Sequence, residues 1–404
     1  MKRKIYIFTS GADPVPPVNG GGVENVIMSM VKQNEEHRRV DMIVYSVFNK
    51  KAVQESYQYS FTKFRFMKVN RLIKILDWLI WAMVHNLFGI NIILFRNLLQ
   101  RFMIILKTHF TIKKIMKKED NCSVIIEHSA LLMHSLIGIN KGNNKIYFHA
   151  HNYIEHNYRF LNPVIEKLDG VISVSAYLKN SNKQLLEKCR NHFVLKNGIE
   201  KERFADDYEN SEKYKALLKK YNSDEKKIIL FIGRIDEQKG TLETVRAFRR
   251  LSRDDVRLLI LGSVFYRKNV HTRYEELVIN EAKGLDVVFT GFIDYDIVPL
   301  FYKMAYLCVL PSKWEEPAGL VMIESMMSGT PLITTKKGGI PEYVKDGCRF
   351  VIVDGNIVTA LSEKMLDVLD EKKESYLHES LYAQSIAEQC NTERFYCELL
   401  NVID

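Results

Sequence analysis

Short apolar runs alternate with amphipathic segments along most of the chain. Where apolar residues recur at helical spacing, residues 23–32 and 176–188, the pattern predicts helices. Alternation of strands with helices in both halves of the chain is typical of doubly wound α/β domains, which bind ligands at the carboxyl ends of their strands. The predicted strands are 5–9, 41–47, 123–126, 145–149, 170–174 and 192–195, then 227–232, 257–261, 287–290, 307–310, 331–334 and 350–353.

A polar stretch separates the two series of strands. Residues 199–226 are charged and contain little apolar material, which predicts a linker. It would join an N-terminal domain, residues 1–198, to a C-terminal domain, residues 227–385, followed by a last helix in 386–404. A length of 404 residues exceeds what one hydrophobic core usually serves, so two domains are expected.

Composition describes a globular chain that folds in a reducing compartment. Apolar residues make up 47% and charged residues 26%, unlike a disordered chain. Six cysteines are scattered without a C-x-x-C pair, which favours free thiols and a cytoplasmic location. The basic start at residues 1–10 precedes only a short apolar run without a small-residue cleavage site, so we interpret it as the first strand and not as a signal peptide.

Positive charge is concentrated in residues 62–118. This segment holds twelve Lys or Arg and one acid, Asp77, a balance of +11 against +9 for the whole chain. It also contains an apolar run, residues 78–95, with Trp78 and Trp81 at one end. The combination favours helices on an anionic membrane surface, at the inner face of the cell membrane, or helices that bind an acceptor. A buried helix and a membrane span are the alternatives. No known base-reading module is present, so nucleic acid is not an expected partner.

Two carboxylates, Glu316 and Glu324, are separated by a proline, a glycine and an apolar helix. Eight positions are a little over two helical turns, so both acids can face one cleft. The loop and first turn offer backbone N–H groups, which suit an anion. These groups belong to Ala318, Gly319, Leu320 and Val321. Alternatively, Glu316 is a capping acid and Glu324 a solvated side chain.

A second candidate phosphate site follows the apolar strand at residues 228–232. Gly233 and Arg234 come next, then Lys239 just before a predicted helix, and two cations at a strand-to-helix turn suit a pyrophosphate. Near the N-terminus, Gly20, Gly21 and Gly22 form a turn that opens a helix. It lacks the third glycine of the dinucleotide fingerprint, which argues against an oxidoreductase.

Six motifs follow one another along the chain. They are Gly20-Gly-Gly-Val-Glu24, Phe148-His-Ala-His151, Asn197-Gly-Ile199, Gly233-Arg234 with Lys239-Gly240, Phe289-Thr-Gly-Phe292, and the Glu316 to Glu324 string ahead of Gly329-Thr-Pro-Leu-Ile333. In this order they resemble the retaining GT-B glycosyltransferases of glycosyltransferase family four, of the bacterial surface-polysaccharide type. The resemblance covers roughly residues 1 to 355. It implies two Rossmann-like domains that face each other across a cleft, with the last helix packed on the first domain.

The resemblance also implies residue roles. Glu324 would hold ribose hydroxyls, Glu316 the hydroxyls of the donor sugar, and the backbone near Ile293 the base. His151 resembles the active-site histidine, with His149 as the alternative and a structural histidine as the third possibility. The predicted catalytic residues are His151, Arg234, Lys239 and Glu316, and the predicted donor site comprises Gly21, Gly22, Gly233, Arg234, Lys239, Ile293, Glu316, Gly319, Leu320, Val321 and Glu324.

The implied reaction moves a hexose-type sugar from a nucleotide diphosphate sugar to a lipid-linked or growing surface polysaccharide acceptor. Its main demand is charge stabilisation of the leaving diphosphate, for which Arg234, Lys239 and the loop amides suffice. We therefore expect no cofactor and no metal, and we interpret Asp294 or Asp296 as a helix N-cap. Ala318 replaces a phenylalanine common in the family and leaves the sugar open. Nucleotide-sugar epimerisation or hydrolysis and a catalytically silent carbohydrate-binding coat protein are the alternative functions.

Overall fold

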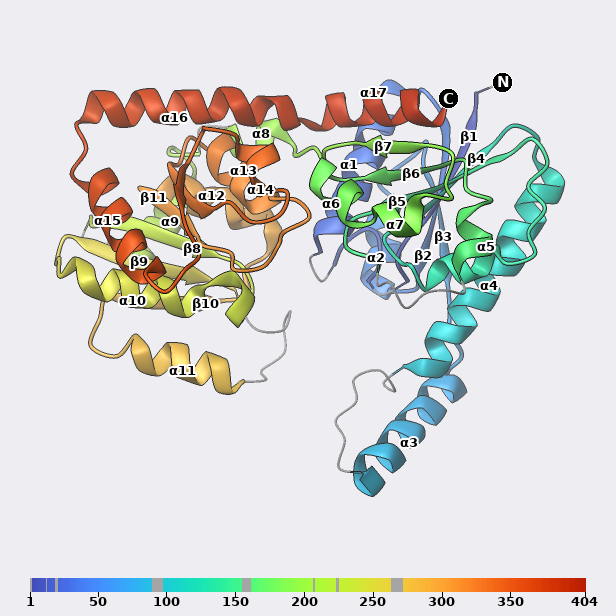
Figure 1. Cartoon of the computed structure of the whole chain (residues 1–404), viewed down its shortest axis with the longest axis horizontal. Helices are drawn as coiled ribbons and strands as arrows, with labels where there is room; N and C mark the ends of the chain where they lie inside the picture. Colours follow the sequence, from blue (N-terminus) through green and yellow to red (C-terminus); the bar gives the residue numbers. More distant parts are fainter. Residues whose placement is uncertain are drawn as a thin grey trace. The chain divides into compact units, whose positions relative to one another are not determined.

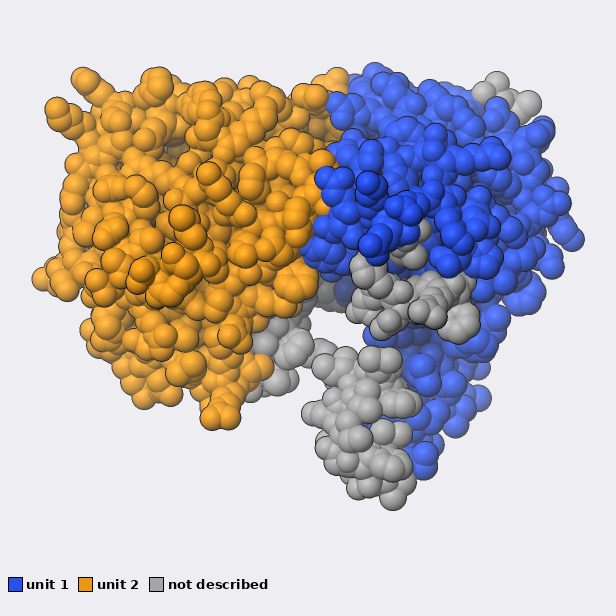
Figure 2. Space-filling model, in the orientation of Figure 1, with its two compact units in different colours: residues 1–174, 178–195, 396–404 blue, residues 175–177, 196–395 orange. Residues whose placement is uncertain are grey.

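The structure, a computed structural model, describes residues 2–11, 13–18, 21–88, 97–154, 161–205, 208–222, 225–262 and 272–404. The chain forms two compact units (Figure 2). Unit 1 comprises Met1–Val174, Leu178–Leu195 and Tyr396–Asp404, and unit 2 comprises Ser175–Tyr177 and Lys196–Phe395. Each unit contains one parallel sheet flanked by helices (Figure 1), so the prediction of two doubly wound α/β domains is confirmed.

Unit 1 has a seven-stranded parallel sheet in the order β3-β2-β1-β4-β5-β6-β7. Chain order reverses between β1 and β4, which makes this the switch point where such sheets bind ligands. Every residue of β4 is buried, because a parallel sheet is covered on both faces. The strands are β1 Lys4–Phe8, β2 Asp41–Val47, β3 Lys63–Met67, β4 Ser123–Glu127, β5 Lys145–Ala150, β6 Gly170–Ser173 and β7 His192–Val194.

The helices of unit 1 differ from the prediction in their bounds. The helix predicted at 176–188 is two short helices, and the one predicted at 23–32 extends further at both ends. The helices are α1 Gly22–His37, α2 Lys50–Ser56, α3 Arg71–Phe88, α4 Leu98–Lys118, η2 Leu132–Leu136, α5 Asn162–Ile165, α6 Ala176–Ser181, whose first residues belong to unit 2, and α7 Lys183–Leu186.

The basic segment, residues 62–118, begins with a strand that the sequence analysis missed. β3 pairs with β2, and the alternation from Lys63 to Phe66 is its period-two signal. α3 and the start of α4 project away from the sheet of unit 1 (Figure 1). Because α3 exposes Leu72, Ile75 and Trp78, the alternative of a buried helix is wrong for this part of the segment.

The predicted apolar run at residues 78–95 lies partly outside the described residues, which stop at residue 88 and resume at 97. Of the helices that the structure describes, none is both long and apolar enough to cross a bilayer.

Unit 2 has a six-stranded parallel sheet in the order β10-β9-β8-β11-β12-β13. Its switch point lies between the central strands β8 and β11, which pair in parallel. The strands are β8 Lys227–Ile232, β9 Val256–Leu261, β10 Val287–Gly291, β11 Leu307–Leu310, β12 Leu332–Thr335 and β13 Arg349–Val351.

Residues 199–226, which we predicted as a linker, are part of unit 2. Phe204, Tyr214 and Tyr221 are buried there against α12, because these few aromatic residues supply the apolar surface that the polar composition concealed. The helices are α8 Lys201–Ala205, α9 Glu212–Tyr221, η4 Glu237–Lys239, α10 Thr241–Leu251, α11 Arg273–Glu281, η5 Tyr295–Ile297, α12 Val298–Met304, α13 Leu320–Met327, α14 Ile340–Val344, α15 Ile357–Leu369, α16 Lys373–Ala387 and η6 Glu388–Cys390.

The last helix, α17 (Thr392–Ile403), is shared by the two units. Its residues from Tyr396 onward belong to unit 1, where the Tyr396 hydroxyl donates a hydrogen bond to Oδ1 of Asn34 at 2.7 Å. Tyr396 and Ile403 are fully buried. The C-terminal residues therefore contribute to the core of the first unit.

Candidate functional site

Lys239 and Glu316 meet at the switch point of unit 2. Lys239 ends η4, which follows β8, and Glu316 lies in the loop after β11. The Lys239 ammonium forms an ion pair with the Glu316 carboxylate, and the Ser312 hydroxyl donates to the same oxygen, Oε1, at 2.7 Å. Both charged side chains are largely buried, at 24% and 13% exposed. The sequence placed both residues in the site, and the structure brings them together.

Close contact of two loops fixes this ion pair. Gly240 has φ +73°, and a Cβ there would lie 2.4 Å from the carbonyl oxygen of Pro311. The Lys313 amide donates to the carbonyl of Gln238 at 2.7 Å. Any larger residue at position 240 would push apart the loops that carry Lys239 and Glu316.

Arg234 follows β8 and is half exposed. It pairs with Asp236 at 3.1 Å, and Asp236 also accepts a hydrogen bond from the Lys239 amide. Two cations therefore lie at one strand-to-helix turn, as predicted. A phosphate group that bound here would compete with Asp236 and Glu316 for them.

The N-terminus of α13 presents backbone donors. Gly319 is its N-cap, and the Gly319 carbonyl accepts hydrogen bonds from the amides of Met322 and Ile323. Within the described part of the chain, the amides of Leu320 and Val321 donate no hydrogen bond. This matches the free N–H groups of a helix start, which attract anions.

Glu324 has different partners from Glu316. It is buried in α13, and the hydroxyls of Tyr295 and Tyr302 donate to its two oxygens at 2.9 and 3.1 Å. Burial raises the pKa of Glu324 to about 7. Ile293, predicted near the base, is half-buried beside the same core. The two acids of the motif are therefore bound to separate groups and not to each other.

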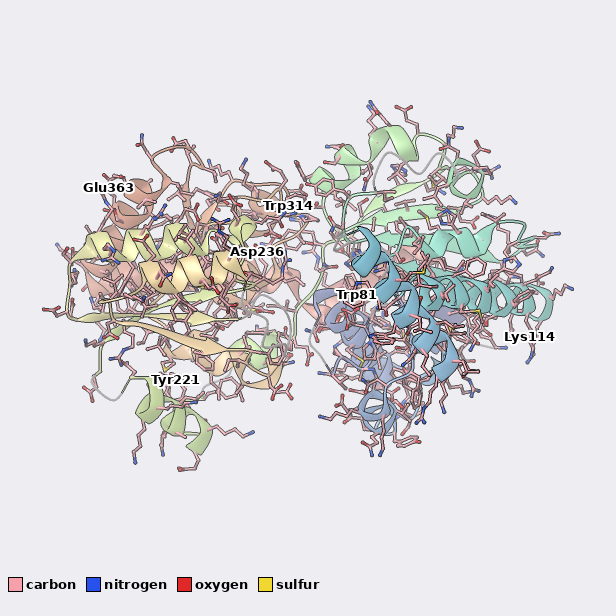
Figure 3. The ribbon with its side chains drawn as sticks, turned by 90° about the horizontal axis from the view of Figure 1, so that it is seen from below. Trp81, Lys114, Tyr221, Asp236, Trp314 and Glu363 are labelled. Carbon is pink, nitrogen blue, oxygen red and sulfur yellow. The ribbon has the colours of Figure 1, made fainter. Side chains whose placement is uncertain are left out.

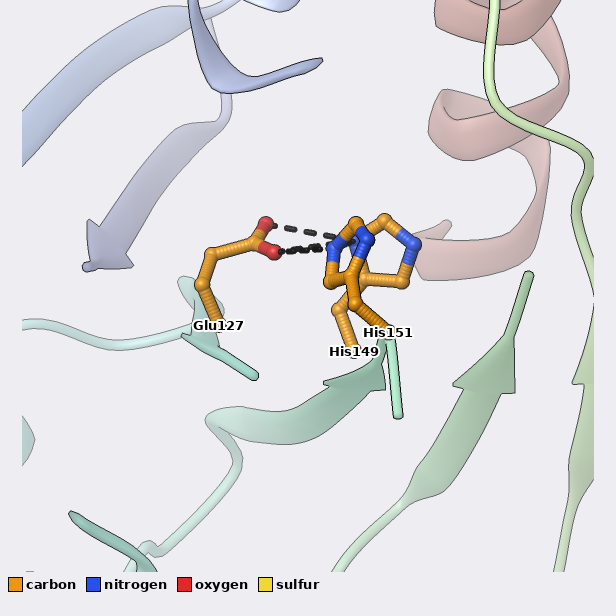
Figure 4. A group of neighbouring side chains, drawn as sticks. All are labelled: Glu127, His149 and His151. Atoms are coloured by element: carbon orange, nitrogen blue, oxygen red, sulfur yellow. Dashed lines mark hydrogen bonds and ion pairs between the residues drawn. The ribbon is translucent and has the colours of Figure 1, made fainter. Parts of the chain in front are cut away.

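In unit 1, three buried side chains meet at the ends of β4 and β5 (Figure 4). Glu127 is opposite His149 in the strand register, and His151 lies on the same side of the chain as His149 because side chains alternate. Oε2 of Glu127 lies 2.9 Å from Nε2 of His151 and 3.0 Å from Nδ1 of His149. These two nitrogens are 3.2 Å apart.

Burial and charge set the ionisation of this cluster. Burial, together with the neighbouring His149, lowers the pKa of His151 to about 4. For Glu127, burial opposes ionisation, but contact with the two imidazoles outweighs it and lowers the pKa to about 2. Glu127 is therefore a carboxylate that accepts hydrogen bonds, and His151 is neutral near pH 7.

The glycine loop of unit 1 leads to a further buried acid. Glu24, in the first turn of α1, is 6% exposed, and burial raises its pKa to about 7. A Cβ at Gly21 would lie 2.1 Å from the Glu24 carboxylate, whereas one at Gly22 would have nothing within 4 Å. Gly21 thus leaves room for Glu24, and Gly22 leaves the loop open. Gly20 lies outside the described residues.

Two candidate metal-binding groups differ in geometry. Glu127, His149 and His151 each offer a ligand atom within 4.8 Å of the others, a set that could hold a divalent cation. Asp294 occupies the N-cap position of η5, although without a side-chain capping hydrogen bond, and Asp296 is exposed beside Arg203. Across the described ranges, the two aspartates belong to no metal-compatible group.

Sequence reasoning missed Glu127, Ser312, Tyr295 and Tyr302. Glu127 had a signal, because it directly follows the apolar residues 124–126, and an acid in such a position is rarely buried without a partner. Tyr295 and Tyr302 could not be identified, because only tertiary packing brings them to Glu324. Ser312 lies four residues before Glu316, so its hydrogen bond depends on the local conformation of the loop after β11.

Part of the chain matches a known protein family. Residues 213–384 match the family described as Glycosyl transferases group 1. Over 240 residues the chain is 29% identical to Lipopolysaccharide 1,2-N-acetylglucosaminetransferase of Salmonella typhimurium, covering 58% of this chain and 59% of that protein. The chain thus matches less than two thirds of this relative's length.

Solved structures are similar over the whole chain. A glycosyltransferase from Rickettsia africae has a TM-score of 0.72 at 19% identity and covers 100% of this chain and 98% of its own. Anabaena Alr3699/HepE in complex with UDP and glucose has a TM-score of 0.71 at 15% identity, with 100% and 99% covered. The chain thus has the fold of GT-B glycosyltransferases, and its residues 213–384 match the Glycosyl transferases group 1 family.

Proposed function

We propose that the chain is a retaining, metal-independent glycosyltransferase that moves a hexose-type sugar from a nucleotide diphosphate sugar to a lipid-linked or growing surface polysaccharide. The observation that carries this proposal is the meeting of Lys239 and Glu316 beside the open amides of α13. Cleavage of the anomeric C–O bond leaves negative charge on the diphosphate. A lysine, an arginine and a helix N-terminus can stabilise that charge.

The contacts of Glu316 suit a switch of partners. Lys239 would bind the diphosphate when the donor arrives, and Glu316, still held by Ser312, would then accept hydrogen bonds from sugar hydroxyls. Glu324 would bind ribose hydroxyls through oxygens that the tyrosine hydroxyls now occupy. The similar Anabaena protein was crystallised in complex with UDP and glucose, which supports a donor of this class.

In unit 1, neutral His151 would bind the reacting sugar or acceptor through hydrogen bonds, with Glu127 fixing its orientation. In front-face retention, the leaving phosphate takes the acceptor's proton, so none of these carboxylates need act as a nucleophile. For the acceptor side, α3 offers exposed apolar residues among cations, which supports peripheral contact with an anionic membrane at its cytoplasmic face.

Thermal unfolding with a panel of nucleotide diphosphates and their sugars tests the donor site. A ligand at about 100 times its dissociation constant adds roughly 2.7 kcal/mol, an easily measured shift. We expect one nucleotide to stabilise the protein and Glu324→Gln to reduce that shift. The nucleotide then enters an acceptor assay, in which release must depend on acceptor and the product anomer is read by NMR. Release without acceptor would indicate a hydrolase or epimerase, and no shift with any nucleotide would contradict the proposal.

A further inference from the structure

Unit 1 contains a pocket of about 400 Å³ where the strands of its sheet begin, at the opposite end of the strands from the buried histidines. Lys4, Asp41 and Lys63 line it and are the first residues of β1, β2 and β3. Glu127, by contrast, is the last residue of β4. All strands of a parallel sheet run in the same direction, so their first residues lie at one end of the strands and their last residues at the other, roughly 15 Å apart for a five-residue strand. This pocket is therefore separate from the candidate site.

The strand register places polar groups on this face of the sheet. Tyr6, Ile43 and Lys63 form one lateral row, and Tyr45 pairs with Arg65 in the next. Parallel sheets normally bury apolar residues on both faces. Here Lys63 and Arg65 are exposed, so β3 adds two cations to the sheet face under the pocket, beside the apolar and aromatic side chains of β1 and β2.

The C-terminal half of α4 forms the opposite wall. Ile115 is buried and packs the helix onto the unit, whereas Lys114 and Lys118 are exposed at the pocket (Figure 3 labels Lys114 on α4). Successive positions three and four apart face the same side of a helix. Two lysines of α4 and two cations of β3 therefore border one pocket from different elements.

Charge in the pocket is only partly compensated. Its lining carries five cations and two carboxylates, a net charge of +3. Glu119 is already used, since it pairs with Lys4 at 2.7 Å and accepts a hydrogen bond from the Tyr6 hydroxyl at 3.0 Å. Among the described residues, Lys63, Arg65 and Lys114 form no ion pair with a carboxylate, and Lys118 interacts with Glu119 through its charge alone.

We propose that this pocket, the β3–α4 pocket, binds a phosphate-bearing anion as a second ligand site, independent of the donor site in unit 2. A phosphate or diphosphate matches four clustered cations in charge, and charge-assisted hydrogen bonds from Arg and Lys favour it over a neutral sugar. The group could come from a soluble phosphate compound or from the head group of an anionic lipid, because α3, with its exposed apolar residues, directly precedes α4.

The test measures the binding of inorganic pyrophosphate by calorimetry. The full chain carries Arg234→Ala and Lys239→Ala, which weaken the unit 2 site. In that background, the double variant Lys63→Ala/Arg65→Ala should weaken binding about 10-fold or more. The matched control, Lys113→Ala/Lys117→Ala, removes the same charge from α4 outside the pocket and should change affinity less than about 2-fold. All four side chains are exposed, so folding should be preserved.

A parallel arm measures co-sedimentation with vesicles containing phosphatidylglycerol, against neutral phosphatidylcholine vesicles. Pyrophosphate binding that the double variant weakens indicates a soluble phosphate ligand. If pyrophosphate does not bind, and vesicle binding is lost in the double variant but kept in the control variant, the ligand is a lipid head group. The proposal is overturned if neither probe binds, or if the control variant weakens binding as much as the double variant. Donor binding in unit 2 is measured separately and does not decide this question.

Discussion

Oε2 of Glu127 lies 2.9 Å from Nε2 of His151 and joins the ends of two neighbouring strands in a buried cluster. Because the ionised carboxylate can only accept, His151 must carry its proton on Nε2. In the neutral ring, Nδ1 is then an acceptor. Glu127 therefore selects both the tautomer and the orientation of His151.

Replacing Glu127 with Gln should lower turnover about 10-fold or more, because the amide no longer fixes the tautomer of His151. Loss of the negative charge should also lower the pKa of His151 further. The measurements are turnover against pH and the ¹⁵N NMR shifts of the imidazole. Glu166→Gln, an exposed acid of the same unit, is the control. Unchanged imidazole shifts in Glu127→Gln would refute the positioning role.

Lys239→Ala should reduce turnover on the order of 10²-fold or more, since it removes a charge that, in the proposed mechanism, stabilises the leaving diphosphate. Lys313→Ala is a matched control, because Lys313 lies near the same loops but pairs with Glu243 at 2.8 Å. Steady-state kinetics on both variants would decide. Near-normal turnover of Lys239→Ala would remove this lysine from the proposed site.

Glu324 should make stability depend on pH. Burial raises its folded-state pKa to about 7, against an ordinary value of 4.5. Because the folded protein binds this proton more tightly than the unfolded chain does, Glu324 adds to the free energy of unfolding. This contribution is fully present below pH 4.5 and is lost as the pH rises through 7. The melting temperature should therefore fall more between pH 5 and 8 in the wild type than in Glu324→Gln. Burial also raises the pKa of Glu24 to about 7, but Glu24 is present in both proteins, so its effect cancels in the comparison. Parallel melting curves would contradict the raised pKa.

Turnover should not change when a chelator is added, because the proposed mechanism stabilises the diphosphate with Lys239 and Arg234. The assay compares activity with and without EDTA, followed by added Zn²⁺, Mn²⁺ or Mg²⁺. The group of Glu127, His149 and His151 makes the experiment informative, since it is compatible with a cation. Activity that is lost in EDTA and restored by one metal would contradict metal independence.

Two aspartates on α3 should weaken binding to anionic vesicles several-fold. Ile75 and Leu79 are 54% and 49% exposed and lie one helical turn apart, so Ile75→Asp/Leu79→Asp adds negative charge to one apolar face. The control is Leu377→Asp/Leu381→Asp, an equally spaced exposed pair on α16. Equal loss of co-sedimentation in both variants would exclude α3 as the membrane-facing surface.

Much of the fold follows from the periodicity of the sequence, because continuous apolar runs such as 228–232 can only be covered strands in a chain of this pattern. The exceptions have physical causes. β3 was missed because its outward cations, Lys63 and Arg65, line a pocket where a sheet normally buries apolar residues. The linker was misassigned because three aromatic residues are enough to anchor a polar segment.

The pairing of Lys239 with Glu316 was predictable at the level of the site, since both follow central strands of one sheet. The tyrosine partners of Glu324 were not, because they come from η5 and α12, whose approach to α13 depends on packing. The spacing of residues in the sequence does not specify which side of α13 faces the tyrosines of η5 and α12.

The passage of α17 between the two units has a consequence for biosynthesis. A ribosome makes residues 1–174 first, yet Tyr396, Leu399 and Ile403, all buried in that unit, emerge more than 200 residues later. The N-terminal unit therefore lacks these core residues until the end of the chain has been made, and its core is complete only when the last helix reaches it. An expression fragment that ends before Tyr396 would expose this gap to solvent and to chaperones.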